Sequence, residues 1–140
     1  MKVFFQKKKI VFHSKLNEFS LKNKFSGSIS SFLGKVRPYK DKKKIKFLEI
    51  ELYKKMAYFQ ADKNLKKILS KIQIDDFLII HRYGKLFPGE NIILVLVASQ
   101  HRKDGLIFTK KSVEWFKKEI TFWKKENFQL HSSWVKSEYE

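Results

Sequence analysis

The stretch IILVLVAS, residues 92–99, decides the fold class of this chain. It is apolar up to its closing Ser99, and it is rich in β-branched side chains. A run of this kind is typical of a central β-strand that is buried on both faces. Other elements must therefore cover both sides of the sheet to which this strand belongs.

The segments on either side of this run predict a strand before it and a helix after it. Residues 75–83 (DDFLIIHRY) have strand character, and the Pro88–Gly89 pair is typical of the centre of a type II turn. Residues 106–125 predict one long helix, because apolar residues recur there at steps of three and four. The residues on this predicted apolar face are Val113, Phe116, Ile120 and Trp123. The tail from residue 128 is less regular, and we expect Trp134 to dock it.

Two segments earlier in the chain repeat this alternation. Residues 45–53 (IKFLEIELY) alternate apolar and polar side chains, which predicts a strand with one buried face. Residues 56–72 change to helical spacing and predict a helix with one buried stripe. The predicted stripe is formed by Met56, Phe59, Leu65, Ile68, Leu69 and Ile72.

The first 44 residues are less regular. Residues 7–13 (KKKIVFH) predict a short first strand, and residues 14–23 predict either a short helix or an irregular crossover. Residues 27–36 have strand character with small side chains, and residues 37–44 predict a polar loop. The order of elements predicts an α+β or α/β sandwich, with helices packed on a mixed sheet. A chain of 140 residues without repeats or linkers is long enough for one such domain.

The chain has a net charge of +17, with 28 Lys, three Arg and no Cys. Such a charge suits a nucleic-acid-binding protein, and this function stays open. The Lys residues, however, are spread along the chain in short runs, which is more typical of solvated faces. The absence of Cys excludes disulfides, thiolate metal sites and a cysteine nucleophile within the chain. Because no apolar run reaches 18 residues and no secretory signal is present, we expect a cytoplasmic protein without a membrane helix.

The three Arg stand out in this Lys-rich background, because Arg offers a planar fork of donors that suits phosphate or carboxylate. His101 and Arg102 follow the predicted central strand, at the edge where open sheets collect ligands, and a helix begins close by. We expect this pair to bind an anion, and a capping or structural role for His101 is equally open. Arg37 likewise directly follows a predicted strand, that of residues 27–36. We expect Arg82 to tie a strand end to a neighbour or to lie in a subunit interface.

Two lysines of the predicted helix 106–125 are candidates for chemistry. Lys117 and Lys124 are seven residues apart, so on a helix both would point the same way at about 10 Å along the axis. Each follows an apolar residue of the predicted buried face. Partial desolvation there would make a neutral amine accessible for acid–base or nucleophilic work. The alternative is that both are boundary lysines whose ammonium groups reach water.

Five segments occur in an order and at separations that resemble one known family. They are SFLGKVRP (31–38), LEIELYKKMA (48–57), IHRYGKLFPGE (80–90), LVASQHR (96–102) and FKKEITFWKKE (116–126). Together, from about Ser28 to Trp134, they resemble the large, catalytic subunit of molybdopterin synthase. The most specific of them are the HR-x-G-x-L-x-x-G-E pattern and the Lys-x6-Lys pattern that ends in WKKE.

The resemblance implies an α/β hammerhead fold with a single domain over residues 1–140, in which residues 1–26 match poorly and 127–140 form a C-terminal tail. It implies a sulfurtransferase of molybdenum cofactor biosynthesis. Each large subunit of the family binds a small ubiquitin-like sulfur carrier whose Gly-Gly tail ends in a thiocarboxylate, and a central dimer makes the assembly a heterotetramer. Two sulfurs pass to cyclic pyranopterin monophosphate, also called precursor Z, and form the dithiolene of molybdopterin. No metal or other cofactor is implied, and a sulfur that arrives on the partner agrees with the absence of Cys.

The resemblance also implies roles for individual residues. Lys117 would be the principal catalytic group, transferring a proton or stabilising the acyl intermediate of the carrier tail, and Lys124 would support it and bind substrate. Phe32 would lie beside the inserted tail. The expected substrate-binding residues are Lys35, Val36, Arg37, His101, Arg102, Lys125 and Glu126. Because phosphate and thiocarboxylate are both anions, fixed cations would lower the cost of bringing them together.

The chain departs from the family pattern at three places. The segment Lys103–Leu106 replaces small and aromatic residues after the His-Arg pair, and Lys54-Lys55 replaces a Pro-Gly pair. Glu138 stands near the place of a basic residue. A catalytically idle scaffold of the same fold also stays open, beside the nucleic-acid-binding alternative.

Overall fold

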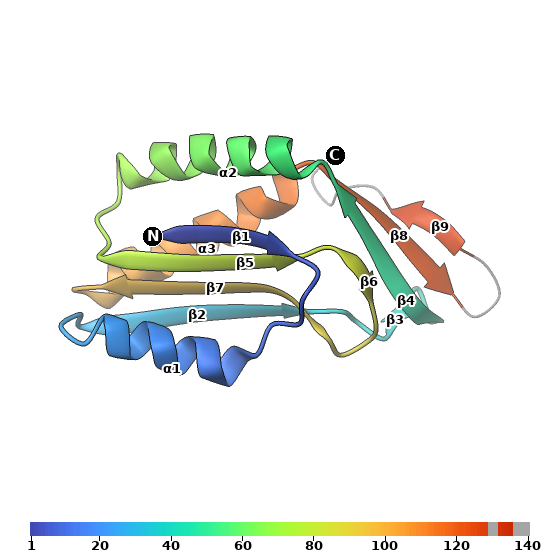
Figure 1. Cartoon of the computed structure of the whole chain (residues 1–140), viewed down its shortest axis with the longest axis horizontal. Helices are drawn as coiled ribbons and strands as arrows, with labels where there is room; N and C mark the ends of the chain where they lie inside the picture. The colour runs from blue at the N-terminus through green and yellow to red at the C-terminus, as the bar shows by residue number, and fades with distance from the viewer. Residues whose placement is uncertain (129–131, 136–140) are drawn as a thin grey trace.

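The computed structural model describes residues 1–128 and the backbone of residues 132–135, so the expected docking of Trp134 lies outside the described side chains. The chain forms an α+β fold, in which helices cover a main sheet and a second sheet extends from its end (Figure 1). Among the described residues, no helix combines the length and the apolar character needed to cross a membrane. In chain order the elements are β1 (Lys2–Gln6), α1 (Phe12–Lys22), β2 (Ser28–Lys35), β3 (Tyr39–Lys40), β4 (Lys43–Leu52), α2 (Lys54–Leu69), β5 (Asp76–Arg82), β6 (Gly84–Leu86), β7 (Asn91–Ser99), α3 (Arg102–Lys118), β8 (Phe122–Phe128) and β9 (Ser132–Val135).

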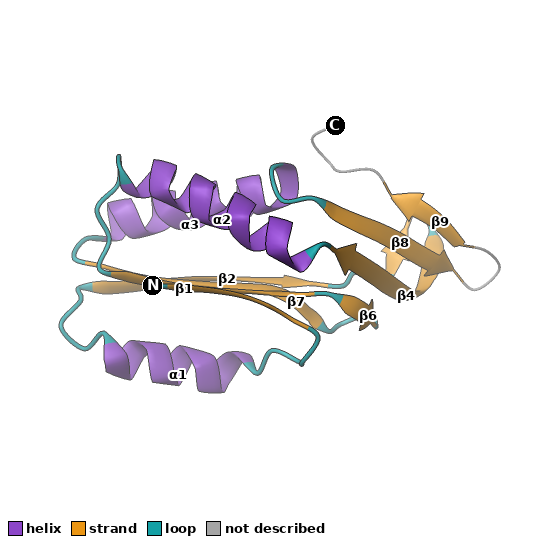
Figure 2. Cartoon of the chain, turned by 45° about the horizontal axis from the view of Figure 1, so that its top comes forward, coloured by secondary structure: helices purple, strands orange, loops and turns teal. Residues whose placement is uncertain are grey.

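Strand β7 lies inside the main sheet, whose strand order is β1-β5-β7-β2. It pairs antiparallel with both β5 and β2, while β1 pairs in parallel with β5. Helix α1 covers one face of this sheet, and α2 and α3 cover the other (Figure 2). Residues 94–98 of β7 are 0% exposed. This confirms the predicted central strand that is buried on both faces, and it confirms helices packed on a mixed sheet.

The second sheet has the strand order β3-β4-β8-β9, and β6 also pairs with β4. In Figure 1 it projects from the end of the main sheet at which β5 and β2 finish. Asp41 and Lys42 form the tip of its β3–β4 hairpin with φ angles of 50° and 66°, as a type I′ turn requires at both central positions. The segment 37–44, predicted to be a polar loop, therefore contains a hairpin.

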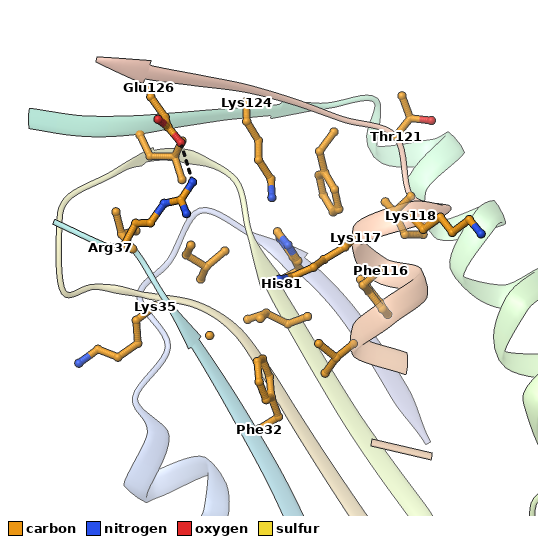
Figure 3. A pocket seen from close by; sticks show the side chains of 18 of the residues that line it. Phe32, Lys35, Arg37, His81, Phe116, Lys117, Lys118, Thr121, Lys124 and Glu126 are labelled. Atoms are coloured by element: carbon orange, nitrogen blue, oxygen red, sulfur yellow. Dashed lines mark ion pairs between the residues drawn. The ribbon is translucent and has the colours of Figure 1, made fainter. Parts of the chain in front are cut away.

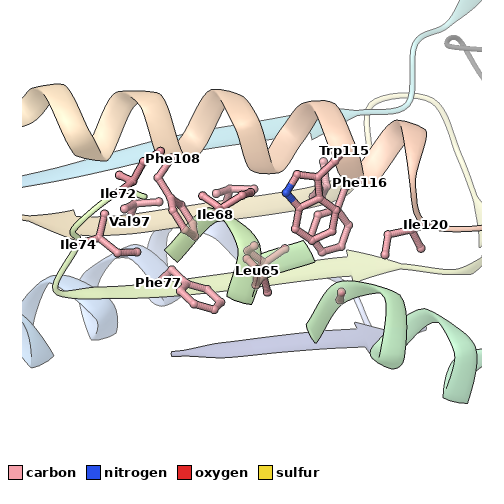
Figure 4. Packing of buried hydrophobic residues seen from close by; sticks show 14 of the residues in the cluster. Leu65, Ile68, Ile72, Ile74, Phe77, Val97, Phe108, Trp115, Phe116 and Ile120 are labelled. Carbon is pink, nitrogen blue, oxygen red and sulfur yellow. The ribbon is translucent and has the colours of Figure 1, made fainter. Parts of the chain in front are cut away.

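A hydrophobic core fills the space between the main sheet and the helices α2 and α3 (Figure 4). The ring centroids of Phe77 and Phe108 lie 5.4 Å apart, and those of Trp115 and Phe116 lie 4.7 Å apart. Full burial of one large apolar side chain contributes about 1.5–3 kcal/mol. A second cluster around Phe19 lies under α1 on the opposite face. The end of α3 is thus held firmly against the sheet.

Helix α3 begins earlier than predicted and ends at Lys118, so the prediction of one helix over residues 106–125 is wrong at both ends. The segment Phe122–Phe128 forms strand β8 instead. The apolar step from Ile120 to Trp123 suggested a continuing helix, but Trp123 is 51% exposed. Pairing with β4 determines the conformation here, because aromatic residues favour strands where a partner strand is available.

Helix α2 confirms the helix predicted over residues 56–72, but it presents a different face to the core. Met56 and Phe59 are 44% and 68% exposed, although they were predicted to be buried. Ala57 and Ala61 lie in the core instead, each 1% exposed. Small side chains let the helix approach the sheet closely, so the buried face lies beside the one that the large apolar residues suggested.

The first strand also differs from the prediction. It is β1, Lys2–Gln6, whereas residues 7–13 lead into α1. The earlier segment is preferred because it pairs with β5 and places Phe5, which is 2% exposed, in the core. Of the two alternatives for residues 14–23, the helix is the one found.

The type II turn predicted at Pro88–Gly89 is confirmed. The Glu90 backbone N–H donates to the Phe87 carbonyl at 3.0 Å. Gly89 has a φ of 86°, which the third position of this turn requires and Gly adopts without strain. The turn joins β6 to β7 and places Glu90 beside the end of β5.

Candidate functional site

A pocket of about 400 Å³ opens where the end of α3 meets the two sheets (Figure 3). Its polar lining residues are Lys35, Arg37, His81, Lys117, Lys118, Thr121, Lys124 and Glu126. Its apolar lining is formed by Phe32, Gly34, Val36, Ile45, Leu48, Ile92, Ile93, Val113, Phe116, Ile120 and Phe122. Because these residues come from β2, β4, β5, β7, α3, β8 and the loops between them, tertiary structure assembles the pocket.

Lys117 and Lys124 reach this pocket from two different elements. Lys117 belongs to the last turn of α3 and Lys124 to β8, and Figure 3 shows both side chains extending into the pocket. The prediction that both project from one helix is therefore wrong. Their spacing of seven residues still brings them to one site, because residues 119–121 join the helix end directly to the strand.

The end of β2 delivers Lys35, Val36 and Arg37 to the pocket. A β-bulge at Lys35 ends the regular pairing with β7. Val36 is 3% exposed, and its backbone N–H donates to the Glu90 carbonyl at 2.9 Å, so Val36 anchors the segment. Phe32 lines the same wall and is 36% exposed. The three substrate-binding residues predicted here, and the predicted carrier contact, thus all lie at the pocket.

Glu126 is a buried carboxylate on β8, and two basic side chains, those of Arg37 and Lys40, lie near it. One of its oxygens lies 3.5 Å from Arg37 Nη2 and the other 3.7 Å from Lys40 Nζ. These distances exceed those of charge-assisted hydrogen bonds, and among the described residues Oε2 has no hydrogen-bond partner. Electrostatic attraction therefore orients Arg37, whose side chain is 58% exposed and can offer donors to a second anion.

His81 lines the pocket, although the sequence did not predict it as a site residue. It lies near the end of β5 and is 5% exposed. Burial lowers the pKa of His81 to about 3, and the charge of Lys124 acts in the same direction. The ring is therefore neutral near neutral pH. The His-Arg pattern marked this position, but it could not show that the His side chain faces the pocket.

Arg82 has the first of the two roles expected for it, because it ties the end of β5 to its neighbours. It is 5% exposed. Its Nη1 donates to Glu90 Oε2 at 2.9 Å, while Nε and Nη2 donate to the Lys7 carbonyl at 3.2 and 3.0 Å. These bonds connect β5 to the segment after β1 and to the turn before β7.

His101 and Arg102 are not part of this pocket within one chain. They lie at the start of α3, and both are exposed. Lys117 follows Arg102 by fifteen residues on the same helix, so roughly 22 Å of helix axis separates them. Lys125 is likewise not among the lining residues. The anion-binding role of His101 and Arg102 stays a prediction. Within a single chain these two residues do not lie near Lys117 and Lys124.

The pocket is strongly cationic. Its basic lining residues are Lys35, Arg37, Lys117, Lys118 and Lys124, and its single acidic lining residue within the described chain is Glu126. Such an imbalance attracts anions and can hold more than one charged group at close range. Lys118 and Thr121 also line it without having been predicted. Among the described residues, no three His, Asp or Glu gather as a metal-binding group.

Comparisons with known proteins agree on one family. A sequence model described as MoaE protein matches residues 5–119. The molybdopterin synthase catalytic subunit of Ralstonia nicotianae is 34% identical over 109 residues, 78% of this chain and 62% of the relative, so the match spans less than two thirds of that protein.

Solved structures share the fold over almost the whole chain. Molybdopterin synthase from Staphylococcus aureus superposes with a TM-score of 0.85 at 29% identity, covering 94% of this chain and 95% of that chain. A Helicobacter pylori structure, described as a protein–protein complex of subunits 1 and 2 of molybdopterin-converting factor, has a TM-score of 0.80 at 19% identity, covering 97% and 91%.

Proposed function

This chain belongs to the MoaE protein family, and from that premise we propose that it is the catalytic subunit of a molybdopterin synthase. Its substrates would be the C-terminal thiocarboxylate of a small ubiquitin-like carrier and cyclic pyranopterin monophosphate. Sulfur passes from the carrier to the pterin side chain and builds the dithiolene. The observation that carries this proposal is the cationic pocket that Lys117 and Lys124 enter from different elements.

Lys117 is the proposed principal catalytic group. It lies at the exposed end of α3 and reaches into the pocket, where a carrier tail and a substrate could both approach it. In the proposed step the thiocarboxylate sulfur forms a carbon–sulfur bond to the substrate side chain in place of an oxygen, which leaves. Water then breaks the acyl carbon–sulfur bond and releases the carrier tail as a carboxylate. Lys117 would transfer a proton in this step or stabilise the charge that develops on the acyl oxygen. Lys124, on the opposite wall, would bind substrate and support the same charge.

The substrate-binding set would hold the anionic groups. Arg37 offers a planar fork to a phosphate, and Lys35 adds a second cation on the same rim. Glu126 would orient Arg37, and the backbone of Val36 fixes the segment that carries both basic side chains. Lys125, next to Glu126, completes the proposed set. Fixed cations lower the electrostatic cost of bringing a phosphate and a thiocarboxylate together.

The partner proposed for this chain is the small carrier subunit. The Helicobacter assembly of two subunits is the precedent for it. The tail of the carrier would enter beside Phe32, whose ring is partly exposed at the pocket. The large subunit would also pair with a second copy of itself in a heterotetramer. If His101 and Arg102 bind substrate, they must reach the pocket of the neighbouring copy, because they lie far from the pocket of their own chain.

The test is reconstitution of molybdopterin formation. Wild-type protein mixed with a thiocarboxylated carrier and precursor Z should yield molybdopterin, and Lys117→Ala should lower its rate by about 100-fold or more. Lys63→Ala is the matched control, because Lys63 is exposed on α2, outside the pocket lining. No product with the wild type, or an undiminished rate with Lys117→Ala, refutes the catalytic role and favours an idle scaffold.

A further inference from the structure

The ring of His81 lies between the two lysines of the pocket. Figure 3 shows the Lys124 side chain descending toward it from β8 and the Lys117 side chain extending toward it from α3. The charge of Lys124 is close enough to act on the His81 ring electrostatically. The imidazole is also almost completely buried, at 5% exposure. A polar ring in this place needs a reason, because burying it costs free energy unless it is hydrogen-bonded.

One hydrogen bond fixes the tautomer of this ring. Its Nδ1 lies 2.8 Å from the backbone oxygen of Arg82. A carbonyl oxygen can only accept, so Nδ1 carries the proton and donates it. Because burial keeps the ring neutral, Nε2 then carries a lone pair and is an acceptor. The chain thus presents a neutral acceptor among ammonium groups.

Aromatic packing fixes the orientation of the same ring. Its centroid lies 4.2 Å from that of Phe122 at an interplanar angle of 18°, and 6.2 Å from that of Phe116 at 7°. Phe116 directly precedes Lys117 on α3, and Phe122 lies two residues before Lys124 on β8. The ring therefore packs against the two elements that carry the lysines, and it couples their positions.

We propose that His81 is a positioning residue for the lysine pair, in which Nε2 accepts a hydrogen bond from the Lys124 ammonium group and holds it on the pocket wall facing Lys117. This inference rests on the proposed function for its catalytic meaning. A neutral acceptor suits the task better than a carboxylate would. A carboxylate would cancel the positive charge that an anionic substrate needs, whereas the imidazole orients the ammonium group and leaves its charge in place. The other charged groups that line the pocket are Lys35, Arg37, Lys118 and Glu126.

The contact itself can be tested without activity, by nitrogen-15 NMR of the four histidine side chains in the full chain. We expect His81 to show the Nδ1–H tautomer and to stay neutral from about pH 8 to about pH 5. Lys124→Ala should change the Nε2 chemical shift of His81, whereas Lys63→Ala on α2 should leave it unchanged. An Nε2 resonance that does not respond to Lys124→Ala, or an Nε2–H tautomer, overturns the proposed hydrogen bond.

The positioning role is tested by kinetics of two variants. His81→Phe keeps a ring against Phe122 and removes the acceptor, so kcat should fall on the order of 100-fold with little change in KM for the carrier. His81→Gln restores an acceptor near the place of Nε2 and should recover part of kcat. Thermal melting of each variant verifies folding, and if His81→Phe does not fold, the comparison rests on His81→Gln and on His81→Leu.

The outcomes separate this inference from the proposed function. Wild-type kcat in a folded variant without the acceptor overturns the positioning role. Equal losses in the Phe and Gln variants overturn it as well, because a purely structural His81 would give no rescue by Gln. If the wild type forms no molybdopterin, the proposed function fails, and the NMR result still decides whether His81 holds Lys124.

Discussion

Replacing Gly105 with Ala tests how closely α3 lies on the main sheet. Gly105 is a buried position of α3. A Cβ atom added there would lie 2.6 Å from Ser99 Oγ and 3.0 Å from Ser30 Oγ. Ser99 is 0% exposed, and its hydroxyl bonds the His101 carbonyl at 2.8 Å and the Ser28 hydroxyl at 2.9 Å. It has little freedom to move away.

Two effects of opposite sign determine how Gly105→Ala changes the free energy of unfolding. Ala is favoured over Gly in a helix interior by about 0.8–1.0 kcal/mol. Overpacking a buried site costs about 1–3 kcal/mol. Because a separation of 2.6 Å is shorter than real Cβ contacts allow, the steric effect should prevail. We expect Gly105→Ala to lower the free energy of unfolding by about 1 kcal/mol, or Tm by about 3 °C.

The assay is urea unfolding of the wild type, Gly105→Ala, Ser99→Ala and the double variant, followed by tryptophan fluorescence. Ser99→Ala alone loses two hydrogen bonds, but it also removes the atom that the new methyl group meets. The double variant should therefore be more stable than the sum of the two single changes predicts, by about 1 kcal/mol. A Gly105→Ala protein as stable as the wild type, or strict additivity, would refute the close approach of helix and sheet.

Two further predictions concern the ion pair at the end of β5. Arg82→Met should lower the free energy of unfolding by about 2–3 kcal/mol, because it removes both bonds to the Lys7 carbonyl and the 2.9 Å ion pair to Glu90, whose remaining cationic partner is the exposed Lys9 at 3.8 Å. Urea unfolding measures this, and a loss below about 1 kcal/mol contradicts it. The second prediction is that acid lowers the stability contributed by Glu90. Burial acts to raise the pKa of this carboxyl group. The hydrogen bonds from Arg82 and from the Phe87 backbone outweigh that effect and hold the pKa below its ordinary value of 4.5. Since the folded pKa is the lower one, this contribution is present above about pH 4.5 and is lost as the pH falls through the folded value. The stability of Glu90→Gln should therefore decline less steeply than that of the wild type between about pH 5 and about pH 3, and an equal slope would count against the pairing.

The sequence predicted those parts of the fold in which local pattern and tertiary environment agree. Residues 92–99 read as a central strand because both faces of that strand are in fact covered. The end of α3 was misjudged because Ile120 and Trp123 are spaced as on a helix, while strand pairing with β4 determines the conformation after residue 121. The buried face of α2 was also misjudged. Periodicity identifies a helix, but it gives no weight to Ala57 and Ala61, whose small size lets the helix approach the sheet.

The sequence predicted only part of the candidate site, because local spacing does not show which elements meet in the folded chain. Lys117 and Lys124 do share a pocket, but from two elements, which residue spacing alone could not distinguish. His81 and Arg82 are neighbours that point to different surroundings, and alternation along a strand cannot say which of the two meets a pocket. His101 follows a central strand as predicted, yet β7 runs antiparallel to β2 and β5 and therefore delivers it to the opposite end of the molecule.

Because the chain changes from helix to strand between Lys117 and Lys124, the direction of the Lys124 side chain depends on whether its position along β8 is odd or even. Along β8 successive side chains face opposite sides, so Lys124 faces the pocket because an appropriate number of residues separates it from the helix end. An insertion that moved β8 by one residue against β4 would turn Lys124 away from the pocket, whereas a shift of two residues would restore its direction. On a single helix, by contrast, the same insertions would rotate Lys124 by about 100° and about 200°. The interval of seven residues thus determines the direction in which Lys124 points as well as its distance from Lys117.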